Sequence, residues 1–170
     1  MADRPKLKVA EPDRDPDAPD GAISNGQRAF WMFLAFMLVA PFFGGLAGAA
    51  MIAVAWGAGI APETFAKMPF GEFQTHIAPI GVTAFVWSVI PAALTAVSLV
   101  PTVLKNGSVS LFMAGAVGVI AFTAAILLFP FPTVGMQPVI MFAAGLISVA
   151  VRSMLMNINI LKPEPPAAAS

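Results

Sequence analysis

The chain has 170 residues, of which 58% are hydrophobic and only 11% are charged, so it has too few polar groups to cover a water-soluble globule. Nine basic residues balance nine acidic ones, and this zero net charge provides no basic surface for a nucleic-acid partner. The absence of cysteine excludes disulfides, thiolate catalysis and cysteine metal sites. We therefore expect a protein whose outer solvent is a lipid bilayer.

Residues 1–27 are rich in charge and proline and contain only scattered apolar residues. Such a segment cannot bury enough apolar surface to offset the entropy lost on ordering, so we predict a disordered cytoplasmic tail. A cleaved signal peptide would place its apolar run at the extreme terminus, whereas the first apolar run here begins at Ala29. We therefore expect the tail to be retained.

The first predicted membrane span covers residues 29–56, and Pro41 is expected to kink it and to free the carbonyl of Met37. Gly44 and Gly48 form a GxxxG step, a pattern that lets helix backbones approach closely in lipid. The four-residue period of this pattern differs from the heptad-like period of the second span, which favours different partners for the two helices. The alternative is that both patterns pack within the chain's own bundle.

Residues 58–75 form the sizeable loop before the second span, and Pro62 with Glu63 suits the first turn of a short helix. His76, the only histidine, lies at the start of the second span. A single histidine cannot supply a haem held by two histidines or a histidine-rich metal site, so we predict no cofactor and no metal. The remaining alternatives are proton exchange assisted by Glu72 and a plain interfacial position, and we expect the second.

The second predicted span, residues 77–103, carries one stripe of small residues on an otherwise bulky apolar helix. Helices in lipid gain little from burying apolar surface against each other, so small residues and hydroxyl groups decide where they pack. We therefore predict that this stripe faces another helix. The stripe consists of Gly81, Ala84, Ser88, Pro91, Thr95, Ser98 and Thr102.

Trp87 lies near the middle of this span, and Pro91 should free its backbone carbonyl from the helical hydrogen-bond pattern. A carbonyl inside a membrane needs a donor, which a hydroxyl, a water or a ligand could supply. We predict a packed kink in which Ser88 or Thr83 satisfies the backbone, and a ligand site is the alternative.

The third predicted span covers residues 110–129, and the fourth covers 134–156 after a short uncharged connection. Arg152 lies near the end of the fourth span and is followed by a mostly apolar run. It either extends to the headgroups or lies in a crevice between helices against a carbonyl that a proline frees, and we predict the first. Residues 162–170 are predicted to form a second disordered cytoplasmic tail.

The sequence therefore predicts an all-α membrane protein in which residues 28–161 form a domain of four transmembrane helices. No Asp or Glu lies in a predicted span, which argues against a proton- or sodium-coupled transporter. We expect a non-catalytic accessory, assembly or scaffold subunit that contacts lipid and binds other membrane subunits or a second copy of itself. The alternative is a small channel or transporter that is complete only as an oligomer. Candidate interface or interior positions are Gly44, Gly48, Gly81, Ser88, Pro91, Thr95, Ser98 and Thr102; candidate functional ionisable residues are His76 and Arg152.

Eight of the nine Lys and Arg residues fall on the side of the two termini, and only Lys67 falls on the other side. The positive-inside rule then places both termini in the cytoplasm, and we expect a bacterial inner membrane. A reporter fused after Ser170 should read as cytoplasmic, and one inserted beside Lys67 should read as external. The same side for both reporters would contradict the four-span topology.

Overall fold

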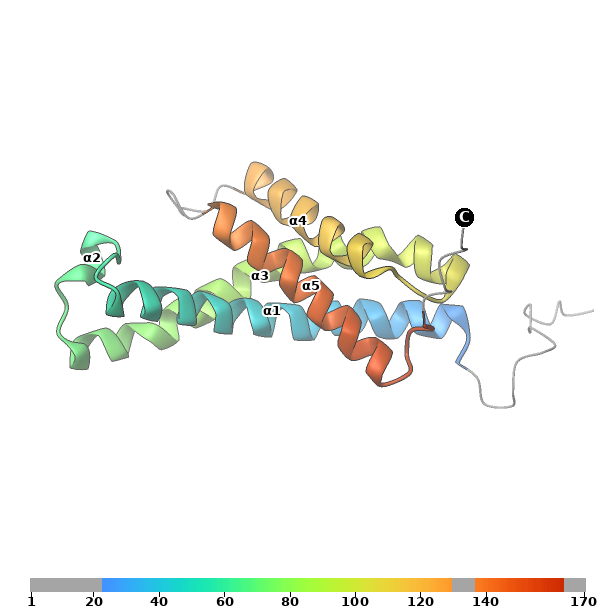
Figure 1. Cartoon of the computed structure of the whole chain (residues 1–170), viewed down its shortest axis with the longest axis horizontal. Coiled ribbons are helices and arrows are strands. Elements are labelled where there is room, and N and C mark those ends of the chain that lie inside the picture. The colour runs from blue at the N-terminus through green and yellow to red at the C-terminus, as the bar shows by residue number, and fades with distance from the viewer. Residues whose placement is uncertain (1–22, 130–136, 164–170) are drawn as a thin grey trace, which may run out of the picture.

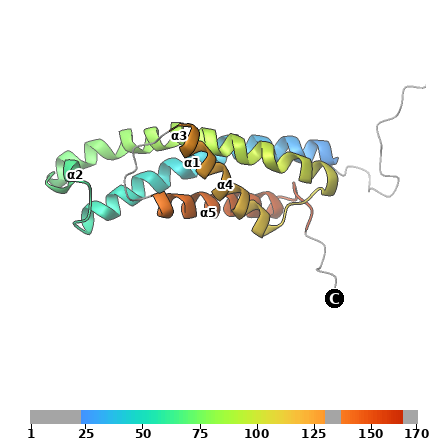
Figure 2. The same cartoon turned by 90° about the horizontal axis from the view of Figure 1, so that it is seen from above.

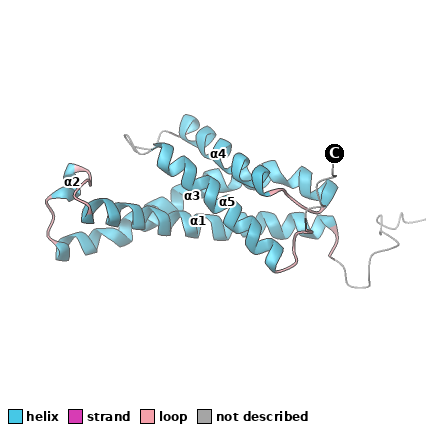
Figure 3. Cartoon of the chain, viewed as in Figure 1, coloured by secondary structure: helices cyan, strands magenta, loops and turns pink. Residues whose placement is uncertain are grey.

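The computed structural model describes residues 23–129 and 137–163. Within these ranges the chain is all-helical, as predicted, and contains four helices that are long and apolar enough to cross a membrane (Figure 3). Such a set of helices fits an integral membrane protein. The helices are α1 (Asn25–Gly57), α2 (Glu63–Ala66), α3 (Phe70–Asn106), α4 (Leu111–Leu128) and α5 (Gln137–Asn157).

Several helices begin and end at residues with the appropriate capping chemistry. The Ser24 hydroxyl accepts a hydrogen bond from the Gln27 amide, and the Gln27 side chain accepts one from the Ser24 amide, which forms a capping box at the start of α1. The Ser110 hydroxyl accepts from the Met113 amide at 3.1 Å and caps α4. Gly107 follows α3 with a φ of 68°, a left-handed conformation that ends the helix.

Two helices extend beyond the spans predicted within them. α1 begins at Asn25, because the capping box at Ser24 draws the last residues of the predicted tail into the helix. α3 begins at Phe70, since Pro69 supplies a start that needs no amide donor. The rest of the predicted tails and the start of the fourth span, residues 1–22, 130–136 and 164–170, lie outside the described residues.

The four long helices form two antiparallel hairpins, α1 with α3 and α4 with α5 (Figure 1). Contacts are most extensive within each hairpin, and the hairpins meet along α3–α4 and α1–α5. At about 1.5 Å per residue, the 37 residues of α3 span about 55 Å and the 18 residues of α4 only about 27 Å. The first hairpin therefore extends past the second at the end that carries α2 (Figure 2). We call this end, residues 55–76, the tip, and the opposite end, where α1 begins, the base.

Glycines that face serines bring the two helices of each hairpin close together. A Cβ atom added to Gly44 would overlap the hydroxyl of Ser88, and one added to Gly118 would overlap the hydroxyl of Ser148. Both serine hydroxyls donate to the carbonyl four residues earlier in their own helix, at 2.6 and 3.0 Å. These bonds satisfy the hydroxyls within one helix, so close fit holds the hairpins together at these points.

α1 packs against α3, although the periods of their small-residue patterns favoured different partners. Gly45 of α1 lies against the backbone of Gly81 in α3, because an added Cβ would stand 2.8 Å from the Gly81 carbonyl oxygen. Over a short stretch, a four-residue pattern and a heptad-like pattern both give the helix a face of small residues. The difference in period therefore does not prevent the two helices from pairing. In the fold, both small-residue patterns pack within the chain's own bundle, as the second interpretation of the sequence had it.

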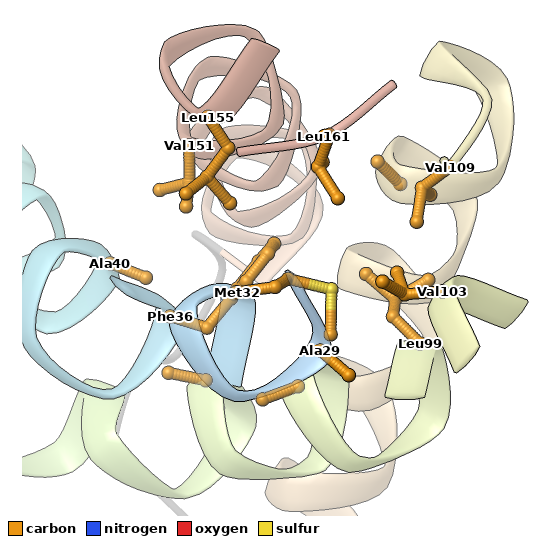
Figure 4. Packing of buried hydrophobic residues seen from close by; sticks show 13 residues of the cluster. Ala29, Met32, Phe36, Ala40, Leu99, Val103, Val109, Val151, Leu155 and Leu161 are labelled. Atoms are coloured by element: carbon orange, nitrogen blue, oxygen red, sulfur yellow. The ribbon is translucent and has the colours of Figure 1, made fainter. Parts of the chain in front are cut away.

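Bulky apolar side chains fill the interior at the base (Figure 4). Met32 and Phe36 of α1 are almost fully buried and lie between α3 and α5. This packing closes the bundle at the base. The residues around them are Ala29, Ala40, Leu99, Val103, Val109, Val151, Leu155 and Leu161.

The fit between α4 and α5 should be sensitive to a single methyl group at Gly118. The added Cβ would stand 2.8 Å from the Ser148 Cβ and 3.0 Å from the Ala144 carbonyl oxygen, so a backbone must shift. We expect Gly118→Ala to cost about 1–3 kcal/mol, measured by thermal unfolding in detergent. In the control, Gly71→Ala in α3, the new Cβ meets nothing within 4 Å. The control should lose no stability, because alanine favours helix by up to about 1 kcal/mol; equal losses in both variants would contradict the close contact.

Candidate functional site

A cavity of about 110 Å³ lies between the four long helices. Its walls on α3 run from Ala84 to Thr95, which is about halfway along that helix. On α1 they run from Phe36 to Met51, and α4 and α5 close the other side. The cavity is thus surrounded by both hairpins and lies at the middle height of the longer one.

Five of the eight predicted interface or interior positions line this cavity. The fold brings together two sequence segments that the sequence could not place side by side, one around the GxxxG step of α1 and one around the proline of α3. The lining positions are Gly44, Gly48, Ser88, Pro91 and Thr95.

The other three predicted positions lie elsewhere. Gly81 packs toward the tip, where an added Cβ would stand 3.6 Å from the Ala49 Cβ. Thr102 lies near the base, and its hydroxyl contacts the Met113 sulfur at 3.9 Å. Ser98 is exposed on the surface of the single chain, so the helix that it is predicted to face would belong to a second chain.

The predicted stripe of α3 leaves the interface because of helix geometry. A straight α-helix has 3.6 residues per turn, so a strict heptad pattern drifts by about 20° per seven residues. Over the 21 residues from Gly81 to Thr102 this drift amounts to about 60°. Beyond Thr95 the buried positions are instead Ala96, Leu99 and Val103.

Three hydroxyl groups in the first two thirds of α3, those of Thr83, Ser88 and Thr95, donate to carbonyls of their own helix. Thr95 is buried and donates to the Pro91 carbonyl at 2.8 Å, while Thr83 donates to the Pro79 carbonyl at 2.9 Å. Ser88 also donates to a carbonyl of its own helix. Contrary to the prediction, neither Ser88 nor Thr83 therefore donates to the carbonyl of Trp87. Each hydroxyl reaches the carbonyl four residues earlier because that is the nearest acceptor in an α-helix.

The cavity wall is predominantly apolar. The Trp87 ring packs edge-on against Phe122 of α4, with ring centroids 5.3 Å apart. The described lining residues include no charged side chain, and the hydroxyls of Ser88, Thr95 and Ser148 already donate within their helices. Such a wall can hold an apolar group but offers little hydrogen bonding to a polar one.

Arg152 is buried rather than extended toward headgroups, so the prediction for this residue is wrong. Its Nε donates to the Val109 carbonyl at 2.9 Å, in the connection between α3 and α4. Arg28, which was not singled out from the sequence, is buried as well, and its guanidinium donates to the carbonyls of Ile23 and Ile160. A buried cation needs such acceptors, so the two arginines fasten separate segments together at the base.

His76 lies beside an aromatic cluster at the tip. The imidazole ring lies 6.3 Å from the Phe65 ring, and Trp56 stacks on Phe73 with centroids 4.6 Å apart. Glu72 is exposed, and no hydrogen bond or ion pair joins these two described residues, His76 and Glu72. The predicted short helix is confirmed as α2, although Pro62 occupies its cap position rather than its first turn.

No known protein-family model matches the chain, and no curated protein or solved structure shows significant similarity to it. Among the described residues, no group of three His, Asp or Glu side chains is placed to hold a metal ion. The cavity, the base and the exposed surface of the first hairpin are therefore the features from which a function can be inferred.

The drift of the α3 stripe predicts unequal effects of leucine at two of its positions. Ala84 lies against Gly48, where an added Cβ would be 2.6 Å from the Ala84 Cβ, so Ala84→Leu should cost about 1–3 kcal/mol. Ser98→Leu changes an exposed side chain and should change stability by no more than about 0.5 kcal/mol. Thermal unfolding in one detergent measures both, and a comparable loss at Ser98 would show that this position is packed.

Proposed function

We propose that this protein is a non-catalytic integral membrane subunit that supports the assembly or stability of a larger membrane complex. The observation that carries the proposal is the unequal length of the two hairpins, which leaves the part of the first hairpin beyond the cavity, residues 52–83, without cover from α4 and α5. We call this part the tip half. The charge distribution supports an orientation with both termini in the cytoplasm, and we propose the inner membrane of a bacterium as its location.

The tip half of the first hairpin offers a large apolar surface to a partner. Val54 and Val82 are 71% and 63% exposed. With α3 about 55 Å long, this hairpin exceeds a hydrocarbon core of about 30 Å, and neighbouring protein can relieve such a mismatch. Helices of another subunit packed beside this half would cover the surface that the short hairpin leaves open.

The interior of the single chain favours this role over conduction. The base is filled by the cluster around Met32, Phe36 and Leu99, so the described bundle holds no continuous path from end to end. The interior hydroxyls of Ser88 and Thr95 are engaged within α3, which leaves them poorly suited to carry a solute.

A small oligomeric channel or transporter is the second candidate, and the exposed position of Ser98 favours it. Several copies that meet along this face of α3 could place their Ser98 hydroxyls around a shared path. Such a path would lie between copies and would bypass the packed base.

Purification from the native membrane in mild detergent separates the two candidates. We expect a stoichiometric complex with other membrane subunits, and Val82→Trp should weaken it several-fold, because the indole alters the exposed surface of the tip half. The matched control is Ile120→Trp, which changes a 66% exposed position on α4 outside that surface. A pure homo-oligomer would support the channel, and an isolated monomer would overturn both proposals.

A further inference from the structure

We propose that the cavity between the two hairpins binds the end of a lipid acyl chain. This inference concerns a ligand of the protein itself and does not depend on the proposed role as a subunit. It rests on the depth of the cavity, on the chemistry of its wall and on the way in which the bundle is closed.

The depth of the cavity matches the terminal part of an acyl chain. The cavity is halfway along α3, at the level of Trp87 and Ser88. Its wall on α4 includes Gly118 and Phe122, in the middle of a helix whose length of about 27 Å is close to that of a hydrocarbon core of about 30 Å, so this level is about 15 Å from either interface. The terminal segments of acyl chains occupy that depth, whereas a polar molecule would have to leave water to reach it.

The small residues that hold each hairpin together also create the space. Gly44 and Ser88 of the first hairpin and Gly118 and Ser148 of the second all line the cavity. These residues are small enough to let the helices within a hairpin approach each other. They are too small to fill the gap where the two hairpins face each other. Apolar cavities of comparable size, about 150 Å³, stay dry and accept apolar ligands.

The wall selects an alkyl group over a polar one. The Ser88, Thr95 and Ser148 hydroxyls donate to carbonyls of their own helices. A ligand with polar groups would lose hydrogen bonds to water without full replacement, whereas a hydrocarbon segment loses none. Contact with the Trp87 and Phe122 rings further suits an apolar occupant.

Entry is possible only from the side or from the tip half. At the base, Met32, Phe36 and Leu99 belong to the buried cluster that closes the bundle. The cavity itself is not sealed, and the contacts between hairpins, along α1–α5 and α3–α4, are less extensive than those within them. A chain in the surrounding bilayer can therefore reach the cavity without crossing the packed base.

Trp87 provides a direct test because its indole lines the cavity. In the parent variant Trp31→Phe/Trp56→Phe, Trp87 is the only tryptophan, and the protein is reconstituted with lipids brominated near the terminal methyl. We expect strong quenching of its fluorescence. Ala143→Leu in this background fills the cavity from α5 and should lower the quenching about twofold, since the added methyl groups take the space of the chain.

Ala150→Leu is the matched control, because this exposed alanine is on the same helix and is not part of the cavity wall. Its quenching should equal that of the parent. Should Ala143→Leu fail to fold, Ala47→Leu fills the cavity from α1 and tests the same expectation. An unquenched parent, or cavity-filling variants quenched as strongly as the parent, would overturn the proposal. Retention of a non-acyl molecule from native membranes, with its loss in Ala143→Leu, would also overturn it.

Discussion

The close contact of a glycine with a serine is the interaction on which each hairpin depends. Gly44 faces Ser88 in one hairpin, and Gly118 faces Ser148 in the other. Lipid is as apolar as the side chains that it touches, so helices in a membrane gain most where backbones can approach closely. The same four residues leave a space between the hairpins, which makes the cavity a consequence of the way in which the hairpins are held.

The base has a different construction from the cavity region. Large side chains such as Phe36 and Leu99 interlock there, and the buried arginines Arg28 and Arg152 bind backbone carbonyls of segments that flank the helices. These bonds offset the cost of removing the guanidinium groups from water and tie the ends of the helices to one another. The bundle is therefore closed at the base and more open toward the middle.

The two proposals use different parts of this construction and are compatible. The tip half of the long hairpin supplies an apolar surface for another subunit, while the cavity faces inward and is suited to a hydrocarbon segment. A bound chain would fill the cavity between the two hairpins, and it would support their orientation without a new protein contact.

The sequence by itself determined the four apolar helices, the short α2 and the small-residue step at Gly44, because hydropathy and residue size are properties of neighbouring positions. Tertiary structure alone decided that α1 pairs with α3, since two different small-residue periods can share one contact. It also turned Ser98 outward through the drift of an α-helix away from a heptad pattern. The burial of Arg152 likewise required the Val109 carbonyl, an acceptor 43 residues away in sequence that only folding brings within reach.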